Sequence, residues 1–239
     1  MRKGNVFLLG IIVISASEIM WQLYKKFNDR RKRAACNGCA ILKTDANEPK
    51  ANISEVMFFS KDSSLCRAHT NSKEACLKDN CPVHYMRKLE NYLNRAEQSL
   101  DVCMYIMTCE SLSNTIVNAY RRGVVVRIIM DGRMAGNDFA QTAVFHKNGI
   151  AIKMHYSDNM MHHKFAIVDG GVLITGSTNW TMSAFFGNFD NIMITNQCSL
   201  VKPFVSEFQK MWDAFESGTL SETEDKLDQL VCDSASSIQ

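Results

Sequence analysis

The clearest structural signal in the sequence lies in residues 162–180, which read HHKFAIVDGGVLITGSTNW. Two apolar, β-branched runs, at 165–168 and 172–175, flank the turn-forming residues Asp169-Gly-Gly. Such runs on either side of an Asp-Gly pair are typical of two antiparallel strands joined by a tight turn. The stretch therefore predicts a buried β-hairpin.

Polar residues stand just before the first run and just after the second. Residues two apart in a strand share a face, so His162 and Lys164 are expected to point the same way. An imidazole beside an ammonium group suggests an anion between them, and a phosphate suits both: Lys164 donates to its oxygens, while His162 attacks phosphorus or donates a proton. Ser177 and Asn179 add neutral donors, and Gly176 permits close backbone approach. The alternative is a core strand that carries His and Lys at the surface.

The spacing H-x-K-x4-D-x6-G-S-x-N resembles the signature of the phospholipase D superfamily at every fixed position. The resemblance implies an α/β fold with a mixed sheet flanked by helices. It also implies a two-step phosphoryl transfer, in which one His forms a phosphohistidine and a second His protonates the leaving oxygen. The implied site has two parts: a catalytic set of His162, Lys164, Asp169 and Asp190, and a phosphate-binding set of Lys164, Ser177 and Asn179.

Two residues of this region, Asp169 and Asp190, have more than one interpretation. Asp169 lies in the turn, where it is expected to serve local architecture more than proton transfer. Asp190 takes the place of the acidic residue that orients the nucleophile in the family, where a carboxylate would fix the imidazole tautomer. It is otherwise a surface residue at a strand end. His163 is expected to face away from the site.

The chain contains one copy of the signature, because neither His146 nor His155 has a Lys two positions later. The resemblance implies a site built from two copies. We therefore expect a homodimer in which the two signatures face each other across a two-fold axis. No catalytic metal is implied, so EDTA should leave the activity unaffected.

Outward from the hairpin, helical and strand patterns alternate. Helices are expected at 87–98, 112–122, 139–147 and 200–215, and strands at 100–107, 124–130, 150–154 and 191–195. Alternation of this kind favours an α/β layer with a largely parallel sheet. The aromatic stripe on the last helix indicates core packing.

The sequence divides into four expected regions. Residues 1–27 hold an apolar run followed by Lys and Arg, which indicates an N-terminal transmembrane anchor with a cytosolic catalytic domain. A cleaved signal peptide is the alternative. Residues 28–54 are a linker that carries the pair Cys36 and Cys39, and 55–217 form the catalytic domain. Residues 218–239 form an acidic tail that is expected to be disordered.

A cluster of cysteine and histidine lies at 66–84 and suggests a small zinc-finger-like insertion. Structural zinc takes four nitrogen or sulfur ligands. The expected ligands are Cys66, Cys76, Cys81 and His84, with His69 as the substitute. The alternative is a set of buried thiols with surface histidines.

Within the superfamily, the single motif, the anchor and the cysteine-rich insertion resemble the Zucchini or mitochondrial phospholipase D family. That resemblance implies a place on the outer mitochondrial membrane, facing the cytosol. The implied activity is cleavage of single-stranded RNA, namely piRNA precursors, in transposon silencing in the meiotic germline. The alternative is hydrolysis of cardiolipin to phosphatidic acid.

The motif alone does not separate these substrates. Lys153, Arg127, Arg133 and Arg121 are candidates for a basic RNA groove, whereas a lipid needs an apolar channel. The net charge of +2 comes from a basic N-terminal region and an acidic tail that flank a nearly neutral middle, which excludes a strongly basic domain. A third interpretation is a non-enzymatic scaffold that binds phosphorylated partners.

Overall fold

The computed structural model describes residues 21–22, 51–71, 76–136 and 140–217. The expected acidic tail and nearly all of the expected anchor and linker therefore lie outside the described residues. Within the described ranges, no helix combines the length and apolar character needed to cross a membrane.

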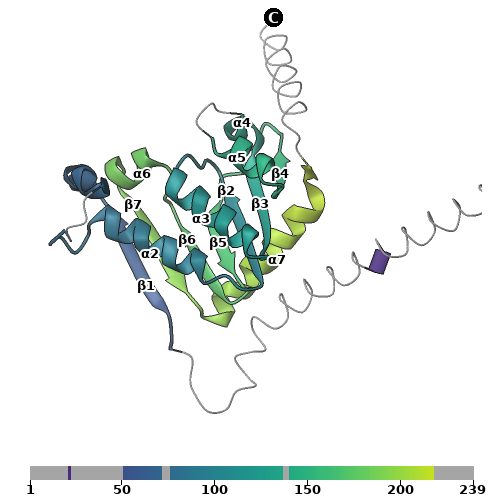
Figure 1. Ribbon diagram of the computed structural model, residues 1–239, viewed down its shortest axis with the longest axis horizontal. Helices are drawn as coiled ribbons and strands as arrows, with labels where there is room; N and C mark the ends of the chain where they lie inside the picture. The colour runs from purple at the N-terminus through teal and green to yellow at the C-terminus, as the bar shows by residue number, and fades with distance from the viewer. Residues whose placement is uncertain (1–20, 23–50, 72–75, 137–139, 218–239) are drawn as a thin grey trace, which may run out of the picture.

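A mixed sheet of eight strands forms the centre of the fold (Figure 1). In chain order the strands are β1 (Ser54–Phe59), β2 (Ser99–Met104), β3 (Val125–Asp131), β4 (Ala151–His155), β5 (Lys164–Val168), β6 (Val172–Gly176), β7 (Asp190–Thr195) and β8 (Glu216–Ser217). Across the sheet their order is β1-β7-β6-β5-β2-β3-β4-β8.

The parallel pairs are β2–β3 and β3–β4, and every other neighbouring pair is antiparallel. The expectation of a largely parallel sheet is therefore wrong, while the mixed α/β class is confirmed. The reason lies in the connections. Helical crossovers join β2 to β3 and β3 to β4, which keeps those strands parallel, whereas β5 turns directly into β6.

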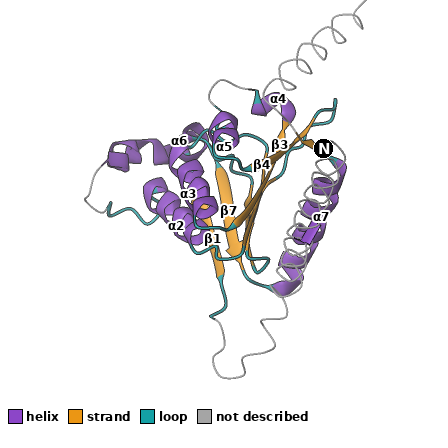
Figure 2. Ribbon diagram, turned by 45° about the vertical axis from the view of Figure 1, so that its right-hand side comes forward, coloured by secondary structure: helices purple, strands orange, loops and turns teal. Residues whose placement is uncertain are grey.

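Helices cover both faces of the sheet, and Figure 2 shows them in two layers. One face carries α2 (Pro82–Asn94), α3 (Glu110–Arg121), α5 (Thr142–Lys147) and α6 (Met182–Gly187). The short helix α4 (Gly132–Ala135) follows β3, and the 3-10 helix η2 (Lys61–Asn71) packs against α6. The other face carries α7 (Cys198–Ala214).

Each face has its own hydrophobic core. On the α7 side, Phe208, Met211 and Trp212 pack with buried residues of the sheet, including Phe165. The aromatic stripe predicted on this helix is therefore confirmed as core packing.

The predicted hairpin is confirmed as β5 and β6, which pair antiparallel. Asp169 has a φ of 51° and Gly170 a φ of 64°, so both central residues of the turn are left-handed. The N–H of Gly171 donates to the carbonyl of Val168 over 3.0 Å and closes the turn. Positive φ at both central positions is the type I′ geometry, which matches the twist of the paired strands.

Two kinds of element differ from the sequence prediction. Helix α2 begins at Pro82, earlier than expected, because proline suits the first turn of a helix, where its missing N–H has no partner to lose. The elements β1, η2, α4, α6 and β8 were not predicted. Strand β1, with the sequence SEVMFF, buries Met57 and Phe59 on one face and pairs with β7 along its length.

Candidate active site

The fold brings the two halves of the signature to one end of the sheet. His162 and Lys164 lie where β5 begins, and Ser177 follows the end of β6. Asp190 opens β7. Because β5, β6 and β7 are antiparallel neighbours, these ends meet at the same edge. Asn179 follows in the loop after β6, and its half-buried side chain has an oxygen with no hydrogen-bond partner among the described residues.

Lys164 is a buried cation at the centre of this group, 8% exposed. Its Nζ donates to the carbonyl of His162 over 2.8 Å and lies 5.0 Å from the ring centroid of Tyr105. Burial lowers the pKa of Lys164, and the charge of Asp190 partly opposes that shift. A buried ammonium group of this kind is stabilised by an anion, so the position suits a phosphate.

The sequence did not single out Tyr105, which lies just after β2. Its ring meets the ring of His162 edge-on, with centroids 4.6 Å apart, and its N–H donates to the carbonyl of His163 over 2.9 Å. Tyr105 thus holds the loop that carries His162. The sequence predicts a strand through residue 107, whereas β2 ends at Met104, so Tyr105 lies in a loop that reaches the site.

Ser177 and Asp190 form the shortest polar contact of the site. The Ser177 hydroxyl donates to Asp190 Oδ1 over 2.6 Å and accepts from the N–H of Asn191 over 3.1 Å. The other carboxylate oxygen accepts from Asn188 over 3.0 Å. Within the described part of the chain, the hydrogen-bond partners of the Asp190 carboxylate are thus Ser177 and Asn188 rather than His162.

Gly176 is required by packing between strands. A Cβ atom at this position would lie 2.0 Å from the backbone carbonyl oxygen of Asn191. The close approach expected from the sequence is real, but it is an approach of β6 to β7.

Asp169 serves local architecture, as expected of a turn residue, and does not join the site as the catalytic set implied by the resemblance would require. It lies at the far end of β5, about 16 Å from Lys164 at the usual rise of a strand. Its carboxylate accepts from the backbone N–H groups of Glu97, Gln98 and Ser99. Asp169 therefore fastens the hairpin turn to the loop before β2.

A cavity of about 460 Å³ opens beside His162. Its lining comes from the loop before β5, the last turns of α7 and the end of β4, and consists of His155, Met160, Met161, His162, His163, Glu207, Lys210, Met211, Ala214 and Phe215. His163 packs its ring against Phe165 on the α7 side of the sheet, so it points away from the face of Lys164, as expected. His155, which the sequence had set aside, stacks on Phe215 with centroids 4.6 Å apart.

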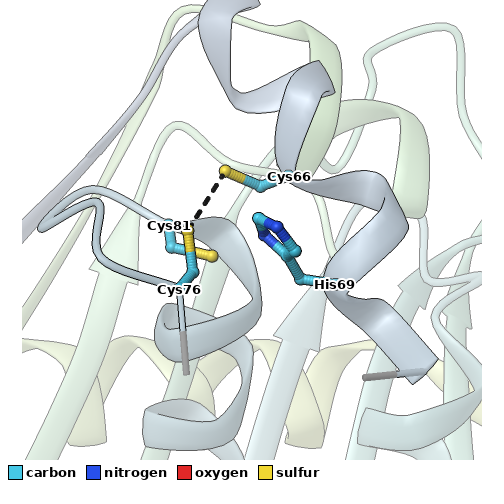
Figure 3. Close-up of side chains that lie close together, drawn as sticks. All are labelled: Cys66, His69, Cys76 and Cys81. Carbon is cyan, nitrogen blue, oxygen red and sulfur yellow. Dashed lines mark hydrogen bonds between the residues drawn. The ribbon is translucent and has the colours of Figure 1, made fainter. Parts of the chain in front are cut away.

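The candidate metal centre is separate from this site. Figure 3 shows the side chains of Cys66, His69, Cys76 and Cys81 pointing toward one another. Their potential ligand atoms all lie within 4.8 Å of each other. His84, the expected fourth ligand, is not part of this group. It lies in the first turn of α2, and His69 on η2 takes its place.

The four side chains fit a tetrahedral zinc ion. The sulfur atoms of Cys66 and Cys76 are 4.0 Å apart, near the ~3.8 Å edge that Zn–S bonds of about 2.3 Å give. The Nδ1 atom of His69 is buried and has no hydrogen-bond partner among the described residues. Burial and the neighbouring thiols raise the pKa of Cys66 to about 11, so a cation is needed to hold it as a thiolate.

The four basic residues considered for an RNA groove are engaged within the protein. Arg127 is buried and forms a two-pronged ion pair with Asp101, at 2.6 Å for each bond. Arg121 donates to Asn148 and Arg133 to Asp158. Lys153 donates to the carbonyl of Trp212 at the end of α7. Their contacts thus serve the structure of the domain.

Comparison with known proteins places this geometry in context. Residues 89–212 match a family model described as cardiolipin synthase, PLD-like domain. A protein of Danio rerio named mitochondrial cardiolipin hydrolase is 34% identical over 180 residues, which cover 72% of this chain and 78% of the relative. A protein of Chlamydomonas reinhardtii with the same name is 29% identical over 218 residues, covering 90% of this chain and 97% of the relative.

Solved structures show the same fold. Nuc from Salmonella typhimurium, a phospholipase D family member, superposes with a TM-score of 0.55 at 22% identity, covering 70% of this chain and 99% of that one. NucT from Helicobacter pylori superposes with a TM-score of 0.56 at 17% identity, covering 70% of this chain and 100% of that one.

Proposed function

Because this chain belongs to the Zucchini or mitochondrial cardiolipin hydrolase family of phospholipase D-like phosphodiesterases, we propose that it hydrolyses phosphodiesters as a homodimer with His162 as nucleophile. The single observation that carries the proposal is the meeting of His162, Lys164 and Ser177 at one edge of the sheet. One chain supplies one such set, and the two-step chemistry needs two histidines.

The proposed reaction has two displacements at phosphorus. An imidazole nitrogen of His162 attacks phosphorus, and the P–O bond to the leaving alcohol breaks. The corresponding histidine of the second copy donates a proton to that oxygen. Water then attacks the phosphohistidine, the same second histidine takes its proton, and the P–N bond breaks to release the phosphomonoester and restore His162.

Lys164 and Asn179 are proposed to stabilise the charge that builds on the phosphoryl oxygens. The Lys164 ammonium lies in a buried position, where its field is screened less than in water. It needs only to exchange the carbonyl of His162 for a phosphate oxygen. The Asn179 amide is a neutral donor to the same oxygens.

Asp190 and Ser177 are proposed to act as a unit. The Ser177 hydroxyl already donates to Asp190, so it contributes to phosphate binding only if its proton turns to the substrate. Asp190 would then be free to orient an imidazole, the role its position in the family implies.

A phospholipid of the cardiolipin class is the substrate that the described surface supports best, with phosphatidic acid as the product. Support comes from the cavity beside His162, whose lining includes Met160, Met161 and Phe215. The names of the relatives support the same substrate and a mitochondrial location. We also propose that the protein lies on the outer mitochondrial membrane with its catalytic domain in the cytosol.

Single-stranded RNA is the second candidate, with piRNA precursors as the form that the family resemblance implies. Two aromatic side chains support it, because bases stack on such surfaces. Tyr105 lies against His162, and Phe189, next to Asp190, is 75% exposed. The burial of Arg127 and the bond of Lys153 to Trp212 weigh against a groove built from those two residues, whereas Arg121 and Arg133 make only exposed contacts.

The deciding experiment offers purified wild-type protein and His162→Asn both single-stranded RNA and cardiolipin vesicles. We expect phosphatidic acid from the wild type alone. RNA cleavage by the wild type alone, without lipid hydrolysis, would make single-stranded RNA the substrate in place of the lipid. No turnover of either substrate would support the non-enzymatic scaffold, and equal turnover by both proteins would indicate a contaminant.

A structural zinc ion is proposed for the group of Cys66, His69, Cys76 and Cys81. When bound, zinc would tie η2 to the start of α2 through four protein ligands, leaving no open coordination position for chemistry. The proposed zinc ion would therefore stabilise the domain and take no part in catalysis.

A further inference from the structure

We propose that the cavity beside His162 is an acyl-chain subsite, which holds one fatty chain of the phospholipid next to the bond that is cleaved. This inference rests on the lipid substrate proposed above. The acyl subsite consists of the apolar lining residues Met160, Met161, Met211, Ala214 and Phe215; the rest of the lining is polar, namely His155, His162, His163, Glu207 and Lys210.

The shape and lining of the acyl subsite suit a flexible apolar ligand. Its volume of about 460 Å³ lies within the range of small-molecule pockets, roughly 300–1,000 Å³. Three of its five apolar side chains are methionines, whose unbranched, polarisable chains adapt to irregular ligands. Met161 and Met211 are buried, whereas Met160 is 59% exposed at the opening. An acyl chain entering here would cover Met160 and exclude water.

The charges at the cavity favour a lipid over a nucleic acid. Its acidic member, Glu207, lies 3.7 Å from the ammonium group of Lys210. The pair is close to neutral, so the wall lacks the net positive charge that a chain of phosphates requires. A carboxylate at this point would repel a second phosphate, whereas an acyl chain carries no charge.

The position of the acyl subsite connects it to the chemistry. His162 belongs to the cavity lining, and its ring meets Tyr105, whose ring centroid lies 5.0 Å from the Lys164 ammonium. A ligand that fills the cavity would therefore reach His162. The stacked rings of His155 and Phe215 also line the cavity. Lys153 and Arg127 contact Trp212 and so hold the end of α7, which carries Met211 and Ala214 of the lining.

The test uses the full-length protein in a detergent that contains no phosphodiester. Substrates are phosphatidylglycerols with butanoyl, hexanoyl or octanoyl chains, each below its critical micelle concentration, and bis(p-nitrophenyl) phosphate, which has no acyl chain. We expect kcat/KM of the wild type to rise roughly fourfold for each methylene that enters the acyl subsite.

Two variants change the acyl subsite: one fills it, and the other makes its lining more polar. Ala214→Trp should fill it and flatten the dependence on chain length, and Met160→Ser should weaken that dependence without disturbing the core, because Met160 is exposed. Ser206→Trp is the matched control, since it adds the same bulk to the exposed side of α7 outside the lining. The control should retain the full chain-length dependence.

The outcomes separate this inference from the proposed function. Hydrolysis of bis(p-nitrophenyl) phosphate with no gain from longer chains would overturn the acyl subsite alone. A chain-length dependence that both Ala214→Trp and Met160→Ser leave intact would place the chain elsewhere and also overturn it. Failure of the wild type to hydrolyse any of these diesters would overturn the phosphodiesterase function itself.

Discussion

The carboxylate of Asp131 accepts a hydrogen bond from the backbone N–H of Met161 over 3.0 Å. Its other oxygen accepts from the N–H groups of Arg133 and Met134 at the start of α4. Asp131 is the last residue of β3 and is 4% exposed. The residue next to His162 is thus tied to the centre of the sheet by a side chain that the sequence did not single out.

Asp131→Ala should lower kcat by about a hundredfold with a smaller change in KM, because a shift of about 1 Å at a catalytic group costs that much. Asp131→Asn, which keeps an acceptor, should recover part of the rate. Steady-state kinetics on a chromogenic diester measure both. Asp158→Ala is the control, since Asp158 is exposed and pairs only with Arg133 at the surface. Equal kcat in Asp131→Ala and the control would refute the positioning role.

The alkaline limit of activity should reflect Lys164. Burial lowers the pKa of this residue below its ordinary 10.5, so the ammonium loses its proton at a lower pH than a typical lysine does. Since the charged form binds phosphate, kcat/KM should fall as pH rises through that lowered pKa. The profile of kcat/KM against pH tests this. Lys164→Arg should retain some activity and move the alkaline fall in kcat/KM to higher pH. A fall at the same pH as in the wild type would show that another group causes it.

The ion pair of Arg127 and Asp101 should dominate the stability of the α7 side. Arg127→Met removes both bonds from Arg127 to the buried Asp101 carboxylate and should lower the free energy of unfolding by about 3–5 kcal/mol. The double variant Arg127→Met/Asp101→Leu should recover most of that loss. Denaturant titration measures all three proteins.

The matched control for this pair lies at the surface. Lys88→Met breaks the exposed pair with Glu55 and should cost about 0–1 kcal/mol. A loss as large as that of Arg127→Met would show that burial is not what separates the two pairs.

Zinc binding should distinguish the two histidines near the cysteine group. The protein should carry about one zinc ion per chain, and His69→Ala should lose it, because His69 lies with the cysteines. His84→Ala should keep the metal, as should Cys198→Ser, which removes a thiol elsewhere. Metal analysis and thermal unfolding with and without a chelator provide the readout. Loss of zinc from His84→Ala alone would restore the ligand set expected from the sequence.

Dimerisation should appear in mixed populations. When wild type and His162→Asn are co-expressed in equal amounts and pair at random, about one quarter of the dimers carry two intact histidines. Activity per total protein should then be about one quarter of that of the wild type. A value of about one half would mean that each chain works alone.

The sequence predicted the part of the site that depends on short-range order. The hairpin, its turn at Asp169, and the meeting of His162 with Ser177 all follow from alternation and spacing within a stretch of under twenty residues. Antiparallel pairing of neighbouring strands then brings the strand ends, and the residues at them, together.

What the sequence missed depends on contacts between distant segments. Strand β1 exists through its pairing with β7, and Ile53 and Asn196 are joined by a hydrogen bond across 143 residues. Tyr105 reaches His162 because β2 lies beside β5. The choice of His69 over His84 depends on how η2 packs near α2, and no ligand spacing encodes that.

Because the Asp169 carboxylate accepts from three backbone N–H groups, mutations at the two ends of the motif should cause two different kinds of defect. Substitution of His162 would yield a normal quantity of inert protein. Substitution of Asp169 would yield fewer folded molecules, each with an intact site, because a loosened turn raises the population open to cellular proteases. The loss of activity from a His162 substitution should not depend on growth temperature. The loss of folded protein from an Asp169 substitution should be smaller at low growth temperature.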